Sequence, residues 1–244
     1  NGYGLTWNIT ERVQAYTHPL WMLALSFVNF FTREVFFTTI AVSILFSLAT
    51  IFWIAFKATR NFLVAASAVI LLCGSKAYVD YSTSGLENPM SHFLLVVFIY
   101  YYFLPTKNLR HLTFLAFIAA LIMLNRQDFA LIVIAPLVHT WHQIWRKSSV
   151  RLFAASFAAL IGFMPLILWL IFSLIYYGFP FPNTFYAKLY NNVPVQVYIQ
   201  NGLAYVQDSF TRDPLTLSIV IIGTISAIIR PTVKRIIIVL GNLF

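Results

Sequence analysis

The chain has 244 residues, of which 60% are hydrophobic and only 9% are charged, and its mean hydropathy is +0.81. A soluble domain carries about 25% charged residues, so this composition excludes an ordinary soluble fold. Sixteen Lys and Arg residues against seven Asp and Glu residues give a net charge of +9. These cations lie in short loops between apolar runs, where membrane topology explains them without a nucleic-acid partner.

Apolar runs of helical length follow one another from residue 35 to the end of the chain. Crossing a hydrocarbon core takes about 20 residues, so the shorter runs must bring their loops close to the membrane interface. The predicted fold class is all-α, a polytopic transmembrane helical protein of about seven or eight spans. Spans are predicted at 35–56, 61–75, 90–104, 111–124, 129–145, 152–177 and 214–229, with a further one beginning at 236.

The region 111–145 is predicted as two helices rather than one. A single helix of this length would reach about 52 Å, against a hydrocarbon core of about 30 Å. It would also place Arg126 and Asp128 near mid-bilayer, at a cost of roughly 2.5–3.5 kcal/mol each. Two helices joined by a tight polar turn at 125–128 avoid both problems.

The charged residues divide the loops into two sets. Loops at 57–60, 105–110, 146–151 and 230–235 hold ten Lys and Arg residues and no acid. All seven acidic residues lie in the alternate loops, together with the other six cations. Because cytoplasmic loops carry an excess of Lys and Arg, the first set is predicted to be cytoplasmic and the acidic set to face outward.

This orientation sets the predicted organisation of the chain. Because Glu34 must already lie outside, the apolar run 20–31 is predicted as a helix along the outer surface. Residues 1–34 are then the end of a first outer loop, and 35–244 form a transmembrane helical domain, with the chain expected to be a piece of a longer protein. Three further segments face outward: 76–89, 125–128 and the long aromatic loop 178–212, which is predicted to be folded or in contact with lipid.

Four outer stretches mix cations, carboxylates or amides with aromatic residues. Arg and Lys bind phosphate, Asn and Glu bond to sugar hydroxyls, and aromatic rings lie against a sugar face or an isoprenoid tail. The mixture therefore suits an anionic sugar-lipid. The stretches are 11–21, 83–89, 125–128 and 182–188.

Taken in this order, the stretches resemble motifs of the GT-C superfamily of multi-spanning glycosyltransferases, in the branch that contains the mycobacterial terminal β-(1→2)-arabinofuranosyltransferase. Residues 2–21 resemble the end of the family's first extracytoplasmic loop, and Ser84-Gly85-Leu86-Glu87 resembles the motif of the next outer loop. Arg126-Gln127-Asp128 matches an arginine–acid turn. The stretch 182–188, Pro182-Asn183-Thr184-Phe185-Tyr186-Ala187-Lys188, resembles a late outer-loop motif.

The resemblance implies an enzyme of the bacterial cytoplasmic membrane, with its active face extracytoplasmic. It would move a monosaccharide from a polyprenyl-phosphate donor to a glycan or lipid acceptor by inverting displacement. A carboxylate base contributes about 10²–10⁴-fold, and positive groups stabilise the leaving phosphate. The family's catalytic Asp segment would precede Asn1, so the catalytic base is expected upstream and this chain alone is expected to be inactive.

The candidate site residues come from these outer segments. Each also has a simpler interpretation: Arg126 and Asp128 as an ion pair that closes a turn, Glu87 as a group at the start of the next helix. Candidates for the donor phosphate are Arg126, Lys188, His18 and Lys76. Candidates for the sugar or acceptor are Glu87, Asn88, Asn183, Tyr186, Glu11, Arg12, Asp128 and Trp21.

Other functions stay open at this point. A transporter or flippase for a lipid-linked anion and a non-catalytic membrane scaffold are the alternatives, whereas a channel is disfavoured because the sequence has no repeated pore-lining pattern. A divalent cation also stays open, since Asp80, Glu87 and Asp128 offer oxygen ligands whose spacing does not demand one. The single cysteine, Cys73, excludes an internal disulfide and a cysteine-based zinc site.

Overall fold

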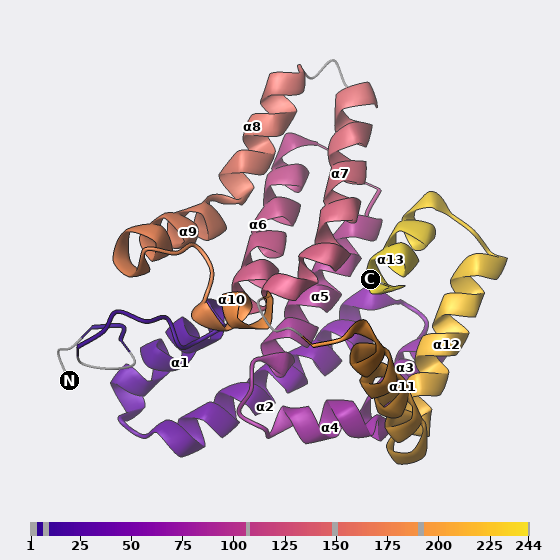
Figure 1. Cartoon of the computed structure of the whole chain (residues 1–244). Coiled ribbons are helices and arrows are strands. Elements are labelled where there is room, and N and C mark those ends of the chain that lie inside the picture. Colours follow the sequence, from indigo (N-terminus) through magenta and orange to yellow (C-terminus); the bar gives the residue numbers. More distant parts are fainter. Residues whose placement is uncertain (1–3, 7–9, 106–107, 148–150, 190–192, 244) are drawn as a thin grey trace.

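The computed structural model describes residues 4–6, 10–105, 108–147, 151–189 and 193–243, and the prediction of an all-α fold is confirmed for this part of the chain (Figure 1). The helices are α1 (Pro19–Thr32), α2 (Val35–Trp53), the π-helical turn η1 (Ile54–Ala58), α3 (Phe62–Gly74), α4 (Lys76–Ser82), α5 (Asn88–Phe103), α6 (Leu109–Asn125), the 3₁₀ turn η2 (Gln127–Phe129), α7 (Ala130–Lys147), α8 (Leu152–Gly162), α9 (Met164–Tyr177), α10 (Asn183–Leu189), α11 (Val195–Arg212), α12 (Pro214–Ile229) and α13 (Val233–Leu243).

Polar residues in the short links determine where several helices begin. The Glu34 carboxylate accepts hydrogen bonds from the amides of Phe36 and Phe37 at 3.0 and 2.6 Å. Asn61 and Asn108 cap α3 and α6 in the same way. Such side chains satisfy backbone donors that have no partner inside the helix, so each cap sets the start of an otherwise apolar run.

The polar turn predicted at 125–128 is present. Arg126 adopts an extended conformation, with φ −146° and ψ 113°, and separates α6 from η2 and α7. The prediction of two helices over 111–145 is therefore confirmed. The outer-surface helix predicted at 20–31 corresponds to α1, which ends at Arg33 in a left-handed conformation.

The run 152–177, predicted as one span, is instead two helices that meet at an angle of 62°. Pro165 explains the break, because it has no N–H to continue the hydrogen bonding of α8 and it is tolerated in the first turn of α9. A similar bend of 71° separates α3 from α4 at Ser75.

By length and composition, the described residues contain one helix fit to cross a membrane, Val35–Lys57, or up to four spans if each of three bent pairs counts as one. The predicted number of seven or eight spans is not confirmed. Helices α5, α6 and α12 have 16, 17 and 16 residues, which is short of the roughly 20 that a straight crossing takes.

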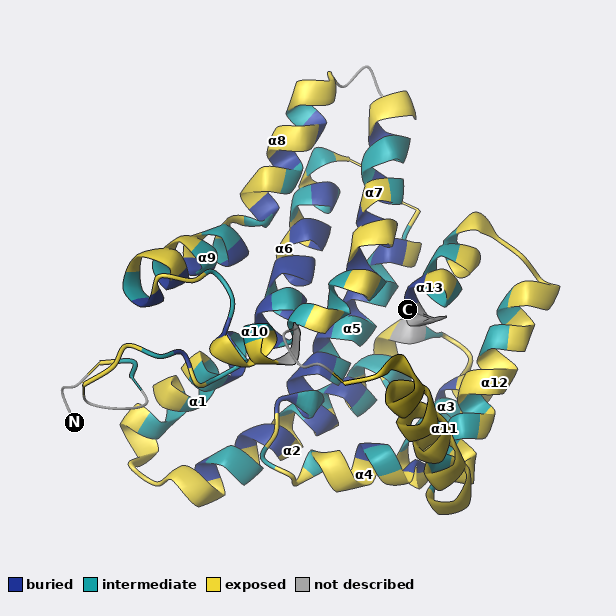
Figure 2. Ribbon diagram, viewed as in Figure 1, coloured by how far each residue is buried: buried dark blue, intermediate teal, exposed yellow. Residues whose placement is uncertain are grey.

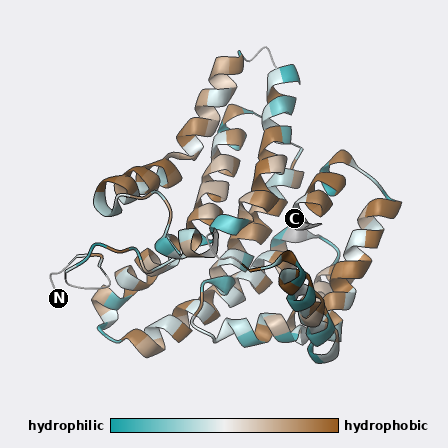
Figure 3. Ribbon diagram, viewed as in Figure 1, coloured by the Kyte–Doolittle hydropathy of each residue, from teal (hydrophilic) through white to brown (hydrophobic). Residues whose placement is uncertain are grey.

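Helix α6 forms the centre of the core, and α5, α7, α8, α9 and α1 pack around it. Leu112, Leu115, Ala119 and Ile122 of α6 are fully buried. Figure 2 shows this central helix mostly buried, whereas α11 and α12 are exposed. Figure 3 shows hydrophobic residues along most of the helices, and many of the large ones are exposed.

Small residues bring α6 and α8 into close contact. A Cβ atom on Gly162 would lie 2.4 Å from the carbonyl oxygen of Thr113 and 2.5 Å from the Cβ of Ala116. The Thr113 hydroxyl donates to the carbonyl of Ala158 at 3.0 Å, which adds a hydrogen bond between the two helices. Small residues that let backbones approach are a common basis of helix association in membranes.

We expect Gly162→Ala to destabilise the protein by about 1–3 kcal/mol, because the added methyl group overpacks this contact. Gly223→Ala is the matched control, since a Cβ atom there meets no heavy atom within 4 Å. At that helical position alanine should be neutral or stabilising by up to about 1 kcal/mol. Thermal unfolding of both purified variants in detergent measures the difference. Equal stabilities would show that α6 and α8 are not in close contact at this point.

Candidate functional site

The four polar stretches identified in the sequence meet at one cavity of about 360 Å³. One stretch precedes α1, one precedes α5, one links α6 to α7, and one contains the start of α10. Side chains from all four line the cavity: Thr17, His18, Glu87, Arg126, Gln127, Asp128, Pro182, Thr184 and Phe185.

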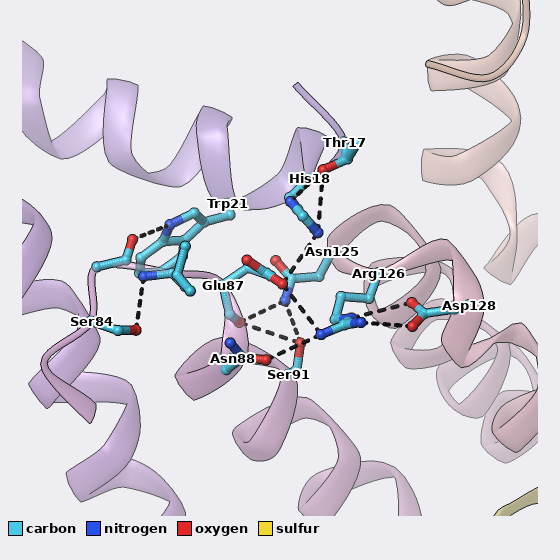
Figure 4. A network of polar contacts seen from close by, with 12 residues as sticks. Thr17, His18, Trp21, Ser84, Glu87, Asn88, Ser91, Asn125, Arg126 and Asp128 are labelled. Carbon is cyan, nitrogen blue, oxygen red and sulfur yellow. Dashed lines mark hydrogen bonds and ion pairs between the residues drawn. The ribbon is translucent and has the colours of Figure 1, made fainter. Parts of the chain in front are cut away.

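Glu87 forms the buried part of the cavity wall and is only 5% exposed. Its Oε1 atom lies 3.2 Å from His18 Nε2 and 3.4 Å from Arg126 Nη1 (Figure 4). A second hydrogen bond, of 2.7 Å, joins His18 Nδ1 to the Thr17 hydroxyl. Because a buried carboxylate is costly without partners, these contacts account for the position of Glu87.

Arg126 is held in one orientation by several acceptors. Its Nε and Nη2 donate to the two carboxylate oxygens of Asp128 at 3.2 and 2.7 Å, and its Nη1 donates to Asn88 Oδ1 at 3.2 Å (Figure 4). The guanidinium also lies over the Phe129 ring, 5.1 Å from its centroid. The hydrogen bond to Asp128 raises the pKa of Arg126, and burial partly opposes this. The side chain stays 30% exposed, so it is accessible from the cavity.

Asn125 connects the end of α6 to the start of α5 and is fully buried. Its Nδ2 donates to the carbonyl of Glu87 at 3.0 Å and to the Ser91 hydroxyl at 2.8 Å. Sequence reasoning assigned no role to Asn125 or Ser91. A polar residue at the end of an apolar helix was the one signal in the sequence that pointed to Asn125. Its partners could not be predicted, because they lie more than 30 residues away in the chain.

The segment before α1 is attached to α9. The hydroxyls of Tyr16 and Tyr177 are 2.5 Å apart, and Tyr177 donates to the carbonyl of Leu5 at 2.6 Å. Ser173 donates to the buried Gln14 at 3.0 Å. Burial, and then the hydrogen bond to Tyr177, raises the pKa of Tyr16. These contacts place Thr17 and His18 at the cavity, and none of them was predicted.

The other candidate residues whose side chains the structure describes do not line the cavity. Trp21 is buried in the core and donates to the carbonyl of Gly85 at 3.0 Å, so it attaches α1 to the stretch before Glu87. Lys76 pairs with Asp80 on the surface of α4, and the Arg12 guanidinium lies over the Tyr176 ring at 4.9 Å.

Three further candidates belong to α10 and one to the N-terminal segment. Tyr186 packs its ring against Phe179 and Phe185. Asn183 and Glu11 are exposed. Lys188 belongs to α10, but its side chain lies outside the described residues. Of the predicted phosphate-binding residues, the structure therefore brings Arg126 and His18 together at the cavity.

The part of the chain that the structure describes contains no group of three or more His, Cys, Asp or Glu residues placed to hold a metal ion. Comparisons of the chain with models of protein families, with curated proteins and with solved structures find no match. Inferences about function therefore depend on the cavity itself and on the resemblance of its motifs.

We expect Asn125→Ala to destabilise the protein by about 1–3 kcal/mol, because it removes two buried hydrogen bonds, to the Glu87 carbonyl and to the Ser91 hydroxyl. Asn183→Ala is the matched control, since Asn183 is exposed and its replacement should change stability by no more than about 0.5 kcal/mol. Thermal unfolding of the two variants in detergent measures both effects. If the two variants unfold alike, Asn125 does not connect α5 and α6.

Proposed function

We propose that the protein is a membrane glycosyltransferase that moves a monosaccharide from a polyprenyl-phosphate donor to an extracytoplasmic glycan or lipid acceptor. The observation that carries this proposal is the meeting of four separate polar stretches at one cavity, beside an exposed apolar helix bundle. Each stretch resembles a motif of the GT-C enzymes, and all four contribute a side chain to the same cavity wall. A polar cavity next to apolar helix surfaces suits a substrate with a sugar phosphate at one end and a hydrocarbon chain at the other.

Arg126 is the residue that we assign to the donor phosphate. Its planar guanidinium presents several N–H groups, which match the oxygens of a phosphate as well as those of a carboxylate. In the structure, the Asp128 carboxylate occupies the edge of the guanidinium formed by Nε and Nη2. A phosphate would therefore replace Asp128 as the anionic partner, and Asp128 would keep the guanidinium oriented before the donor binds.

The charges of the described cavity explain why a second cation would strengthen the binding of a phosphate. Glu87 and Asp128 contribute two negative charges and Arg126 contributes one positive charge. A phosphate would bring further negative charge, so protonated His18, 3.2 Å from Glu87, would improve its binding. We assign the predicted Lys188 the same supporting role. Glu87 and Asn88 are then the groups that orient sugar hydroxyls.

The membrane arrangement belongs to the same proposal. The chain would cross the bacterial cytoplasmic membrane in seven or eight helical segments, with the cavity at the extracytoplasmic surface. Apolar segments shorter than the core can still cross where the bilayer thins locally or where flanking residues extend to the interface. A transporter would be expected to bind its substrate near the middle of the bilayer. Because the cavity lies where helices begin and end, we favour an enzyme that acts from one side.

We expect Arg126→Ala to reduce sugar transfer by about 10²–10³-fold, the usual effect of removing a group that stabilises developing negative charge. Arg126→Lys should restore only part of the activity, because a single ammonium cannot reproduce the planar guanidinium. Transfer from labelled polyprenyl-phosphate sugars is measured in membranes that contain the full-length protein.

Lys76→Ala serves as the control for this assay, because it removes a cation outside the cavity. It should leave transfer unchanged. Immunoblotting of the membrane fraction establishes that all variants are inserted to the same level. Full activity of Arg126→Ala at equal insertion would overturn the assignment of Arg126. No transfer by the unmodified protein from pentosyl, hexosyl or amino-sugar donors would count against the glycosyltransferase proposal.

A further inference from the structure

Helix α11 separates its apolar and polar side chains onto opposite faces. Residues at helical spacing form one apolar face: Val195, Ile199, Leu203, Val206 and Phe210, with Tyr198 and Tyr205 along one edge. The opposite face carries Gln196, Gln200, Ala204, Gln207 and Thr211, and Val197 is its one large apolar residue. This division is typical of an amphipathic helix with one face in water and the other in an apolar environment.

The apolar face of α11 is not covered by the described part of the chain. Leu203 is 66% exposed and Phe210 is 61% exposed, and no residue of α11 is buried. Figure 2 shows α11 exposed along its length, and Figure 3 shows that it carries both hydrophobic and hydrophilic residues. An apolar face of this size in water would be costly, at about 25 cal/mol per Å².

The junction with α12 indicates what covers this face. Helix α12 follows α11 after one residue and meets it at 109°. Unlike α11, α12 has no charged residue, and its only polar side chains are the hydroxyls of Thr216, Ser218, Thr224 and Ser226. An amphipathic helix that turns by about a right angle into an uncharged, largely apolar helix is the arrangement expected where a chain passes from the membrane surface into the hydrocarbon core.

A second bent pair of helices lies beside the junction of α11 and α12. Helix α3 is apolar and turns by 71° into α4. The end of α3 is attached to the start of α12, since the hydroxyls of Ser75 and Thr216 are 2.6 Å apart. The neighbouring apolar helices α3 and α12 therefore each adjoin a sharp bend, and the two bends lie side by side. This is expected of helices that reach the same membrane surface.

Asp213 makes this junction rigid. Its carboxylate accepts hydrogen bonds from the Thr216 hydroxyl at 2.7 Å, the Thr216 amide at 3.1 Å and the Ala77 amide of α4 at 2.8 Å. These hydrogen bonds, with that of the Thr216 side chain the largest, lower the pKa of Asp213. The junction between α11 and α12 is thus attached to a third helix, α4.

We propose that α11 lies in the lipid headgroup region on the cavity side of the membrane, with its apolar face among the acyl chains. The partner is the bilayer itself. Because Asp208 and Arg212 pair with each other at 2.6 Å, α11 has no net charge and its binding does not require anionic lipid. This inference does not depend on the glycosyltransferase proposal, since it concerns a helix outside the cavity.

Two labelled variants on opposite faces test the proposal. In the complete protein with Cys73→Ala, an environment-sensitive fluorophore is attached through Val206→Cys on the apolar face or Ala204→Cys on the polar face. Both side chains are exposed, so neither variant should disturb folding. The protein is reconstituted in phosphatidylcholine vesicles, with and without phosphatidylglycerol. Quenching is measured with lipids brominated on their acyl chains and with aqueous iodide.

We expect the fluorophore at 206 to show blue-shifted emission and quenching by brominated lipid, and the fluorophore at 204 to be quenched by iodide. Both results should be the same with and without phosphatidylglycerol. Iodide quenching at both positions would overturn the proposal by placing α11 in water. Protection of position 206 from both quenchers would also overturn it, since another part of the chain or a second copy would then cover the face. A requirement for phosphatidylglycerol would overturn the inference that apolar burial alone holds α11.

Discussion

The close contact between α6 and α8 is the constraint on which the rest of the structure depends. Gly162 and Ala116 let the two backbones approach, and Thr113 donates a hydrogen bond across the contact to Ala158. Within a bilayer, apolar surface alone gives helices little reason to associate, so small residues and interhelical hydrogen bonds determine which helices pair. Because α6 is held in this way at the centre of the core, its end at Asn125 has a defined position.

The position of Asn125 at the end of α6 determines where the cavity forms. Asn125 attaches the end of α6 to the carbonyl of Glu87, and the next residue, Arg126, lies beside the Glu87 carboxylate. Glu87 is buried because His18 and Arg126 pair with it, and Arg126 is oriented because Asp128 and Asn88 accept its hydrogen bonds. The polar groups are therefore positioned before any ligand binds, which reduces the cost of ordering them on binding.

The bent helix pairs show how a largely apolar chain exposes polar residues at a defined level. The turns at Ser75 and Asp213 are joined by hydrogen bonds, and α4 leads from this junction into the stretch that carries Glu87. In the arrangement that we propose, the membrane surface, the amphipathic helix α11 and the cavity therefore lie close together. Binding of a lipid-linked substrate would require this proximity, because its charged headgroup and its hydrocarbon chain occupy different environments.

The sequence by itself determined the helical class, the polar turn at 125–128, the presence of a helix at α1 and the four stretches that carry polar groups. These features depend on local composition: apolar runs form helices in lipid, and charged residues end them. Only the tertiary structure decided that α8 and α9 bend apart, that Trp21 lies in the core and that the loop 178–212 contains α11. The contacts of Asn125, Tyr177 and Asp213 likewise join residues far apart in the chain, so they follow from helix packing and cannot be read from sequence spacing.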